Sequence, residues 1–382
     1  MTTPGRLPRS GKRPLPDEGR LRVLLLSDAV PGRNGVGTYY DDLMEHLRPR
    51  VAEVRLVAPP PPDGPPGLPG RHFPMPGDPT QTLFVPSIRA VRAVAEEVRP
   101  HVIVAASPWI LGWMGFPLAR TFDAGFCIGY HTQFERIAEL YWPRGLSRVA
   151  RPVLGWWDHL FLRLADTVAV LNKGLEADAR RGGCRSVEIM GTPSPKAFLR
   201  ALPPPPPTAI RSLLFLGRLA PEKRVGQILA AAEAHPDLRV RIVGDGPLRA
   251  DVDAAADRLP NLETVPWVAR EQVMEHLDAS DLVVLPSRFE TFGSAAYEGM
   301  LRRRVVLASP GCGLLEWPRL REGVFVMEPE ETVSAAVGRL RGLDAATLSR
   351  VAEAGHDAAR ELSLAAVDGW VDLLRTIARG RR

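Results

Sequence analysis

Short apolar segments alternate with amphipathic ones along the chain, and five consecutive prolines at 203–207 interrupt this alternation. Before the prolines, strands are predicted at 21–27, 54–58, 102–106, 126–130 and 167–171, with helices from residue 38 and over 86–98. After them, strands are predicted at 212–217, 238–243, 262–265, 281–285, 304–308 and 323–327, and helices at 223–234, 247–258, 270–278 and 294–302. Strands that alternate with helices form parallel sheets covered on both faces. The sequence therefore predicts an α/β protein of two doubly wound, Rossmann-like domains that face each other across a cleft.

The proline run also predicts where the two domains meet. Consecutive prolines adopt a stiff extended form and do not continue a helix or a central strand. We therefore expect a linker at 203–210 between an N-terminal domain over 21–202 and a C-terminal domain over 211–360. Residues 1–20 are predicted to be a disordered basic tail, and the proline- and glycine-rich stretch 59–79 to be a loop. A last amphipathic stretch, 361–380, is predicted to be a docking helix.

The distribution of charge and the number of cysteines limit the classes of partner and the cellular compartment that we expect. The net charge of the 382 residues is +5, but residues 1–22 carry +4 and the last four residues +3, which leaves −2 for the body. A nucleic-acid binder needs positive charge on a folded face, so no nucleic-acid partner is predicted. Three widely spaced cysteines, Cys127, Cys184 and Cys312, indicate a reducing, cytoplasmic compartment. The uncharged stretch 102–119 contains two prolines and two glycines and is predicted to be a strand followed by a helix rather than a membrane span.

Four loops at the expected carboxyl ends of strands carry unusual polar content, and ligands bind there in parallel α/β sheets. The first holds Gly35 in a glycine-rich turn that does not match a dinucleotide fingerprint, and the second holds His131. In the third, Arg218 and Lys223 flank a turn and can converge on one diphosphate, although a solvated pair would also explain them. The fourth holds Glu290.

Glu290 is followed by Phe292-Gly293 at a predicted helix start, and Glu298 lies about one turn into that helix. Free amides at a helix start hold anions, but two glutamates there would repel phosphate unless they point elsewhere. Sugar and ribose hydroxyls are the partners that suit them. The D-x-D sequence at Asp251 and Asp253 lies in a predicted helix, where the two side chains diverge, and is interpreted as a solvated face. No metal is therefore needed to balance the phosphate charge.

Together, FLGRLAPEKRV at 215–225, IVGDGPL at 242–248 and the E-x7-E pattern from Glu290 to Glu298 resemble the family 4 glycosyltransferases, glycosyl transferases group 1, which are retaining enzymes of the GT-B fold. The loop NGVGTY and the segment YHTQF in the first half resemble the same family. The resemblance implies a hexosyltransferase that uses a nucleotide diphosphate sugar as substrate, with no cofactor and no metal. It also implies an acceptor-side N-terminal domain, a donor-binding C-terminal domain, and a C-terminal helix that returns to the first domain.

The same resemblance implies roles for particular residues. Arg218 and Lys223 match the pair that binds the donor diphosphate, Glu298 the carboxylate that holds the ribose, and Glu290 the one at the donor sugar. His131 matches a histidine beside the transferred sugar. The remaining matches are Gly35 near the diphosphate, the backbone around Phe292, Gly293 and Ser294 at sugar or phosphate, and Trp267 and Val268 at the base.

Several alternatives stay open on the sequence alone. A nucleotide-sugar epimerase or a catalytically inert partner protein would have the same two-domain build, and a nicotinamide dehydrogenase is disfavoured by the glycine pattern. The acceptor is a glycan, a lipid or a small molecule. Peripheral contact with the inner face of a membrane stays open through the basic tails and the Trp156-Trp157 pair, which packing against the core would also explain.

Overall fold

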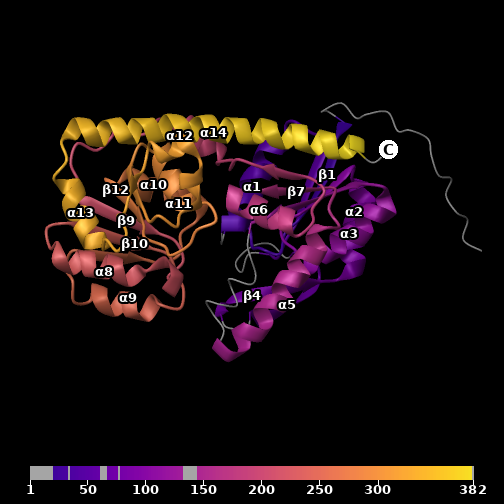
Figure 1. The fold of residues 1–382 in the computed structure, drawn as a ribbon, viewed down its shortest axis with the longest axis horizontal. Coiled ribbons are helices and arrows are strands. Elements are labelled where there is room, and N and C mark those ends of the chain that lie inside the picture. Colours follow the sequence, from indigo (N-terminus) through magenta and orange to yellow (C-terminus); the bar gives the residue numbers. More distant parts are fainter. Residues whose placement is uncertain (1–19, 33–34, 61–66, 76–77, 132–143, 381–382) are drawn as a thin grey trace, which may run out of the picture.

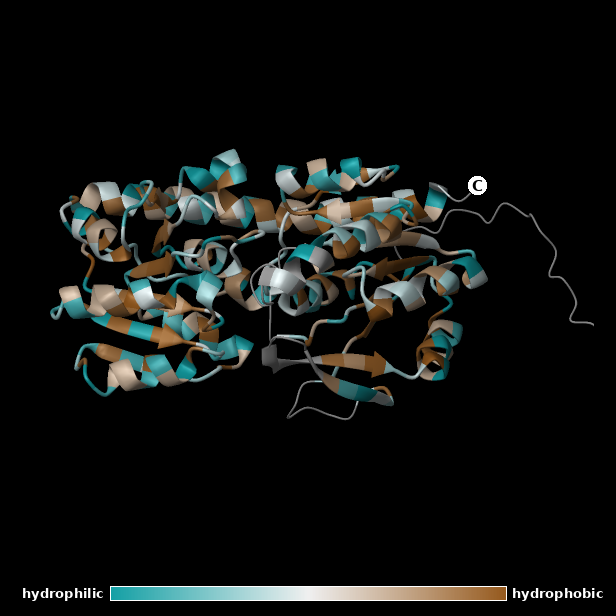
Figure 2. Cartoon of the chain, turned by 60° about the horizontal axis from the view of Figure 1, so that its bottom comes forward, coloured by the Kyte–Doolittle hydropathy of each residue, from teal (hydrophilic) through white to brown (hydrophobic). Residues whose placement is uncertain are grey.

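The computed structural model describes residues 20–32, 35–60, 67–75, 78–131 and 144–380. Residues 1–19 of the predicted basic tail lie outside the described residues. It contains two six-stranded parallel sheets, each flanked by helices (Figure 1). The predicted pair of doubly wound α/β domains is confirmed. In Figure 2 the strands of both sheets are mostly hydrophobic, whereas the helices carry both polar and apolar residues. This pattern is the one expected for sheets that are buried on both faces.

The first sheet has the strand order β2-β1-β5-β6-β7-β8. Its strands are β1 (Arg22–Leu26), β2 (Glu53–Val57), β5 (Val102–Ala105), β6 (Gly125–Tyr130), β7 (Thr167–Val170) and β8 (Val187–Ile189). The helices between these strands are α1 (Gly35–Leu47), α2 (Ile88–Val98), α3 (Ile110–Phe122), α5 (Arg144–Leu162) and α6 (Lys173–Arg181), and α7 (Lys196–Arg200) follows β8. β5 and α3 confirm the strand and helix predicted over 102–119. No helix in the described part of the chain is both long enough and apolar enough to cross a membrane.

The second sheet repeats this arrangement with the order β11-β10-β9-β12-β13-β14. Its strands are β9 (Ser212–Leu216), β10 (Arg239–Val243), β11 (Leu262–Val265), β12 (Leu282–Leu285), β13 (Val305–Ala308) and β14 (Phe325–Val326). Its helices are α8 (Val225–Ala234), α9 (Arg249–Ala256), α10 (Arg270–Asp278), α11 (Ser294–Leu301), α12 (Pro318–Arg321) and α13 (Val333–Arg341).

Two sequence-based predictions were wrong in detail. Part of the stretch predicted to be a loop, 59–79, contributes to an antiparallel hairpin of β3 (Gly70–Met75) and β4 (Asp78–Pro86). A two-stranded hairpin tolerates proline because each strand has an edge that needs no backbone donor. The last helix, α14 (Ala345–Gly380), starts well before residue 361, so the boundary placed at 360 falls inside one continuous helix.

α14 runs along both domains (Figure 1). Towards its C-terminus, the Trp370 indole donates a hydrogen bond to the Tyr39 hydroxyl of α1, at 2.6 Å. Nearer the second domain, the Tyr297 hydroxyl of α11 donates to the Ala359 carbonyl, at 2.8 Å. Tyr39, Tyr297 and Trp370 are all almost fully buried. The helix therefore ties the two domains together through its packed face.

Two buried arginines at the start of β13 hold the linker. Arg302, whose side chain is 1% exposed, pairs with Asp278 and donates to the carbonyls of Ala201 and Leu202. Arg304 donates to the carbonyls of Pro204 and Pro205. Proline lacks a backbone donor but keeps its carbonyl acceptor, so arginine side chains can fix a polyproline segment.

We predict that Arg302→Met lowers the free energy of unfolding by about 3 kcal/mol, because it leaves Asp278 and two carbonyls without their partner. The matched control is Arg241→Met, which removes the more exposed pair with Glu263 and should cost under about 0.5 kcal/mol. Urea unfolding measures both variants. Equal losses in the two would contradict the structural role of Arg302.

Candidate active site

The loops at the carboxyl ends of the two sheets meet between the domains. Gly35 begins α1, and a Cβ at this glycine would lie 3.8 Å from the Ser294 hydroxyl oxygen at the start of α11. A second contact joins the same regions, because the Asn172 amide donates to the Thr291 carbonyl at 2.7 Å. The structure therefore brings together Gly35 and Ser294, two residues predicted from opposite halves of the chain. The first turn of α1, which the sequence analysis treated as loop, already includes Gly35 and Gly37.

Lys223 and Glu290 form an ion pair on neighbouring loops. Lys223 ends a 3₁₀ turn after β9, and Glu290 follows β12. The Ser287 hydroxyl donates to the same carboxylate oxygen of Glu290, at 2.8 Å. Both charged side chains are largely shielded from solvent, with 21% and 14% exposed. Lys223 is thus paired rather than solvated, and its positive charge balances the negative charge of Glu290.

Arg218 lies on the same loop as Lys223, directly after β9. Its guanidinium is 3.6 Å from the Glu222 carboxylate, and its side chain is 23% exposed. The Glu222 carbonyl in turn accepts a hydrogen bond from the Arg288 amide, at 2.8 Å. The loop with the two predicted cations and the loop with Glu290 are therefore held side by side.

Glycines fix the backbone around Glu290 and the start of α11. Gly293 has a φ of 104°, which favours glycine, and a Cβ there would lie 2.6 Å from the Cys312 sulfur. The Gly313 amide donates to the Glu290 carbonyl, and a Cβ at Gly313 would clash with the Thr291 carbonyl. Phe292 is buried against the Tyr297 ring. The Phe292-Gly293-Ser294 segment is thereby held in one conformation at a helix start, where backbone amides can bind an anion.

Glu298 belongs to a buried cluster that crosses the domains. Arg270, the first residue of α10, contacts Glu298 at 2.5 Å and Asp42 of α1 at 2.8 Å. Its guanidinium also lies 5.6 Å from the centre of the Phe198 ring. The Glu298 and Asp42 side chains are only 5% and 8% exposed. We call Asp42, Arg270 and Glu298 the interdomain ion cluster.

One guanidinium between two buried carboxylates leaves the interdomain ion cluster with a net negative charge. Burial raises the pKa of Asp42 to about 7, against the lowering effect of Arg270, and the nearby Glu298 raises it further. Burial acts to lower the pKa of Arg270, but the two carboxylates outweigh it, so that pKa is raised. A proton on Asp42 near neutral pH relieves the excess negative charge.

Sequence reasoning did not identify Arg270 and Asp42 as site residues. A signal existed for Asp42, because it occupies the same helical stripe as the buried Tyr39, Leu43 and His46. A carboxylate on a buried stripe requires a partner. No comparable signal marks Arg270, because arginine occurs throughout this sequence and one more arginine does not stand out.

His131 lies at the end of β6, but it is enclosed rather than open to solvent. Its Nε2 is 2.9 Å from the Tyr40 hydroxyl, its ring packs on Tyr39, and it is 5% exposed. Burial lowers the pKa of His131 to about 3, so the ring is neutral at physiological pH. Among the described residues, its Nδ1 has no hydrogen-bond partner. Whatever His131 contributes, it contributes as a neutral imidazole.

Trp267 and Val268 lie in the loop between β11 and α10, shortly before Arg270. Trp267 is 37% exposed, and Val268 is partly buried. The indole is therefore available to stack on a flat ligand at the β11 end of the second sheet. This loop leads directly into the helix that carries the interdomain ion cluster.

Asp28, at the end of β1, is a further residue that the sequence analysis did not single out. It accepts hydrogen bonds from the Leu111 amide at 2.9 Å and the Ser107 hydroxyl at 2.8 Å. Burial raises its pKa to about 6. The contact to Leu111 satisfies a free amide at the start of α3. Its position directly after a predicted strand was the signal that could have found it.

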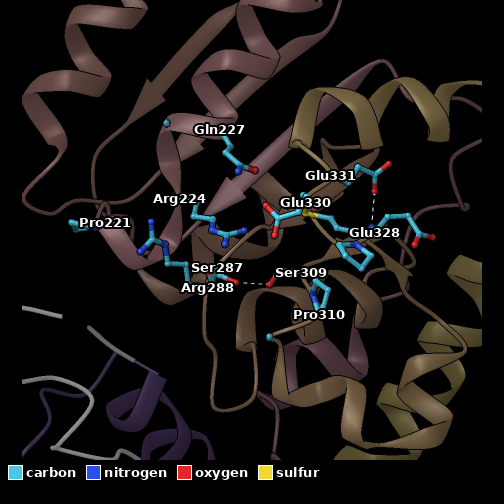
Figure 3. A pocket seen from close by; sticks show the side chains of 14 residues that line it. Pro221, Arg224, Gln227, Ser287, Arg288, Ser309, Pro310, Glu328, Glu330 and Glu331 are labelled. Atoms are coloured by element: carbon cyan, nitrogen blue, oxygen red, sulfur yellow. Dashed lines mark hydrogen bonds between the residues drawn. The ribbon is translucent and has the colours of Figure 1, made fainter. Parts of the chain in front are cut away.

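A polar cavity of about 590 Å³ opens beside the Glu290 loop in the second domain (Figure 3). Arg224, Arg288 and Gln227 lie on one side of it and Glu328, Glu330 and Glu331 on the other. None of the residues predicted as a site lines it. It touches the site through Ser287, whose hydroxyl binds Glu290.

Asp253, from the D-x-D sequence, lies on α9 and pairs with Arg249 at 2.8 Å. The described residues include no cluster of histidine, cysteine, aspartate or glutamate suited to a metal ion. Asp253 therefore has a local structural partner on its own helix.

Two parallel α/β domains that face each other, with charged side chains on the loops between them, form the architecture of the GT-B transferases. Residues 34–193 match the model of the glycosyl transferase 4-like domain, and residues 206–343 match glycosyl transferases group 1. The chain is 30% identical over 318 residues to a GDP-mannose-dependent alpha-mannosyltransferase of Mycobacterium tuberculosis, covering 77% of this chain and 80% of that protein. The protein belongs to the group 1 glycosyltransferases and transfers a sugar from a nucleotide sugar.

Solved structures share the fold. Sucrose-phosphate synthase of Thermosynechococcus elongatus matches with a TM-score of 0.69 at 20% identity, covering 93% of this chain and 98% of that one. HepE of Anabaena, solved with UDP and glucose, matches with a TM-score of 0.66 at 15% identity, covering 93% and 99%. These likenesses confirm the GT-B fold predicted from the sequence.

We predict a pH effect from the interdomain ion cluster. Because the pKa of Asp42 rises from 3.8 to about 7 on folding, the folded protein keeps a proton that the unfolded chain releases between these values. Rising pH in this window therefore destabilises the wild type through Asp42. Asp42→Asn lacks this titration. The free energy of unfolding of Asp42→Asn minus that of the wild type should therefore increase by about 2–4 kcal/mol as the pH rises from 4.5 to 7.5.

Urea unfolding at several pH values measures this difference. Asp237→Asn is the control, because Asp237 is exposed and its hydrogen bond with Arg341 lowers its pKa below the usual value. Asp237 is therefore ionised in both the folded and the unfolded protein over this pH window, and this variant should give a profile parallel to that of the wild type. Parallel pH profiles for wild type and Asp42→Asn would contradict the raised pKa of Asp42.

Proposed function

We propose that the protein is a retaining, metal-independent hexosyltransferase that moves a hexose from a UDP- or GDP-hexose to an acceptor hydroxyl. The observation that carries this proposal is the placement of Lys223–Glu290 and Arg270–Glu298 at the domain interface where Gly35 approaches Ser294. The name of the mycobacterial relative makes GDP-mannose the first donor to test.

The donor would be held through its charged and hydroxyl groups. Arg218, Lys223 and the amides around Gly293 would bind the diphosphate, and Trp267 with Val268 the base. Arg270 would orient Glu298 through one carboxylate oxygen, so that the other oxygen accepts a ribose hydroxyl. Since Glu298 is almost fully buried, we expect the domains to separate at the Asp42–Arg270 contact when the donor enters.

Phosphate arrival would redistribute the charges at Lys223. The ammonium now paired with Glu290 would turn towards the diphosphate, and the Glu290 carboxylate would accept sugar hydroxyls instead. Ser287 would keep Glu290 in place throughout, because its hydroxyl binds the same carboxylate. One lysine would thereby couple diphosphate binding to the release of the sugar-binding carboxylate.

In the chemical step, the bond from the anomeric carbon to the phosphate oxygen breaks and a bond to the acceptor oxygen forms on the same face. The acceptor proton passes to the departing phosphate oxygen. Arg218 and Lys223 would stabilise the charge that develops on the diphosphate, a contribution of several kcal/mol. Neutral His131 and Glu290 would position the sugar. With this charge balanced by protein groups, the proposed step requires no metal.

We further propose a cytoplasmic enzyme with peripheral contact to the inner face of the membrane. The three cysteines are free, and Cys127 and Cys312 are buried, as suits a reducing compartment. Trp156 is 62% exposed on α5, and the same helix carries exposed arginines. Exposed tryptophan beside arginine is typical of surfaces that contact anionic lipid.

A donor panel tests the proposed function. Calorimetry with GDP-mannose, UDP-glucose, UDP-galactose and UDP-GlcNAc should identify one that binds, and NMR of the transferred or hydrolysed sugar should show the donor's anomeric configuration. EDTA should leave the turnover unchanged. Inversion of the anomer or loss of activity in EDTA would refute those two parts of the proposal.

We predict that Lys223→Ala and Glu298→Ala each weaken nucleotide affinity roughly 10- to 100-fold, through lost diphosphate and ribose contacts. Glu290→Gln should instead lower kcat about 100-fold with little change in nucleotide affinity, because it alters the contact at the sugar. Lys173→Ala, at an exposed lysine of α6, is the matched control. Wild-type nucleotide affinity in both Lys223→Ala and Glu298→Ala would disprove the assignment.

A further inference from the structure

The polar cavity of about 590 Å³ beside the Glu290 loop lies outside the proposed donor site (Figure 3). None of the residues assigned to the donor lines it. Its walls come from the loops that follow β9, β12, β13 and β14, at the carboxyl edge of the second sheet. Ligands bind at this edge in parallel α/β proteins, and cavities of about 300–1,000 Å³ suit small molecules. The position and the size of the cavity therefore fit a further ligand in the same domain.

Unpaired charges of opposite sign line the two sides of the cavity. Arg224 and Arg288 lie on one side, and Glu328 and Glu330 on the other (Figure 3). Within the described part of the chain, none of these four side chains forms a hydrogen bond or an ion pair. Two neighbouring carboxylates repel each other, and so do two guanidinium groups. The cavity is therefore complementary to a molecule that has an anionic end and a cationic end.

Two further polar side chains complete the lining. Arg339 binds both carboxylate oxygens of Glu331, each at 2.9 Å, so the charge of this glutamate is already balanced. The side-chain oxygen of Gln227 is buried and has no hydrogen-bond partner among the described residues. Figure 3 shows this amide pointing towards Arg224 and Glu330. A donor group of a bound molecule could satisfy the amide oxygen after a small rotation of the side chain.

The cavity shares two loops with the proposed donor site. Arg224 directly follows Lys223, at the end of the 3₁₀ turn after β9. Arg288 directly follows Ser287, whose hydroxyl also lines the cavity and binds the Glu290 carboxylate. An anion held by both arginines would therefore bridge the loop that carries Lys223 and the loop that carries Glu290.

From this geometry we infer that the cavity is a second ligand site, and that it binds a small phosphorylated amine, of the amino-sugar phosphate class, as an effector of sugar transfer. The phosphate would contact Arg224 and Arg288, because guanidinium groups bind phosphate oxygens in pairs. The ammonium group would lie between Glu328 and Glu330 and relieve their repulsion. The effector role rests on the proposed function, whereas the binding site itself does not.

Calorimetry of the full chain with glucosamine 6-phosphate tests the site. We expect binding, and at least tenfold weaker binding of glucose 6-phosphate, in which a hydroxyl replaces the ammonium group. Glucosamine and inorganic phosphate, each of which lacks one end, should also bind at least tenfold more weakly. Equal affinity for glucose 6-phosphate would overturn the assignment of an amine, and equal affinity for inorganic phosphate would reduce the cavity to a simple anion site.

Substitutions at the two sides of the cavity locate the ligand. Arg288→Gln should weaken binding of glucosamine 6-phosphate at least tenfold. Glu328→Gln combined with Glu330→Gln should abolish the preference for glucosamine 6-phosphate over glucose 6-phosphate and leave the affinity for the latter unchanged. Arg239→Gln is the matched control, at an exposed arginine of β10 outside the cavity, and should change neither affinity. Wild-type affinities in both the Arg288 variant and the double variant would place the ligand elsewhere and overturn the inference.

Nucleotide affinity tests the effector role, with whichever of GDP and UDP the protein binds. Saturating glucosamine 6-phosphate should tighten nucleotide binding at least threefold, because the two bridged loops are then preorganised. The same addition should have no effect in Arg288→Gln. Unchanged nucleotide affinity in the wild type would overturn the effector role, and competition between the two ligands would assign the cavity to the donor site. Binding of glucosamine 6-phosphate to a protein that binds neither nucleotide would reject the proposed function and leave the second site standing.

Discussion

One guanidinium, that of Arg270, connects the two halves of the site. It contacts a carboxylate from each domain, Asp42 on α1 and Glu298 on α11, in surroundings that exclude most water. A buried pair of this kind contributes little net stability, but losing one partner is costly. The main effect of the interdomain ion cluster is therefore to position groups rather than to add stability. The same contacts of Arg270 hold the Glu298 side chain and set the relative position of α1 and α10.

A second ion pair resolves an electrostatic conflict within the site. Glu290 lies beside a helix start suited to an anion, so an unpaired carboxylate there would oppose diphosphate binding. In the structure, Lys223 pairs with the Glu290 carboxylate and Ser287 donates a hydrogen bond to it. On the proposed mechanism, the same lysine then serves the diphosphate while Glu290 turns to hydroxyl groups. Within the second domain, this exchange thus needs no large rearrangement of the Glu290 loop, whose backbone is held by Gly293 and Gly313.

The sequence predicted the fold well because its signals are local. Buried parallel strands such as β5 and β12 are continuous apolar runs in the sequence, which is the signal that predicted them. The hairpin β3–β4 was missed because its many prolines and glycines indicated a loop. Composition does not show that each of the two strands has an unpaired edge, where proline is tolerated. The site residues around Glu290 could be identified from the sequence because the spacing between Glu290 and Glu298 is itself a recognisable pattern. The Arg270–Asp42 contact joins positions 228 residues apart, and no local pattern encodes such a pair.

α14 limits how the two domains can move. Trp370 holds it to Tyr39 in the first domain, and the Tyr297 contact at Ala359 holds it to the second. A rotation that breaks the Asp42–Arg270 contact must therefore bend this helix or slide one domain along it. Sliding would move α11, and with it Glu298, relative to Gly35, because α11 packs directly on α14. On the proposed function, opening of the donor site and displacement of Glu298, the carboxylate proposed to bind the ribose, would be parts of one motion set by the packing of α14.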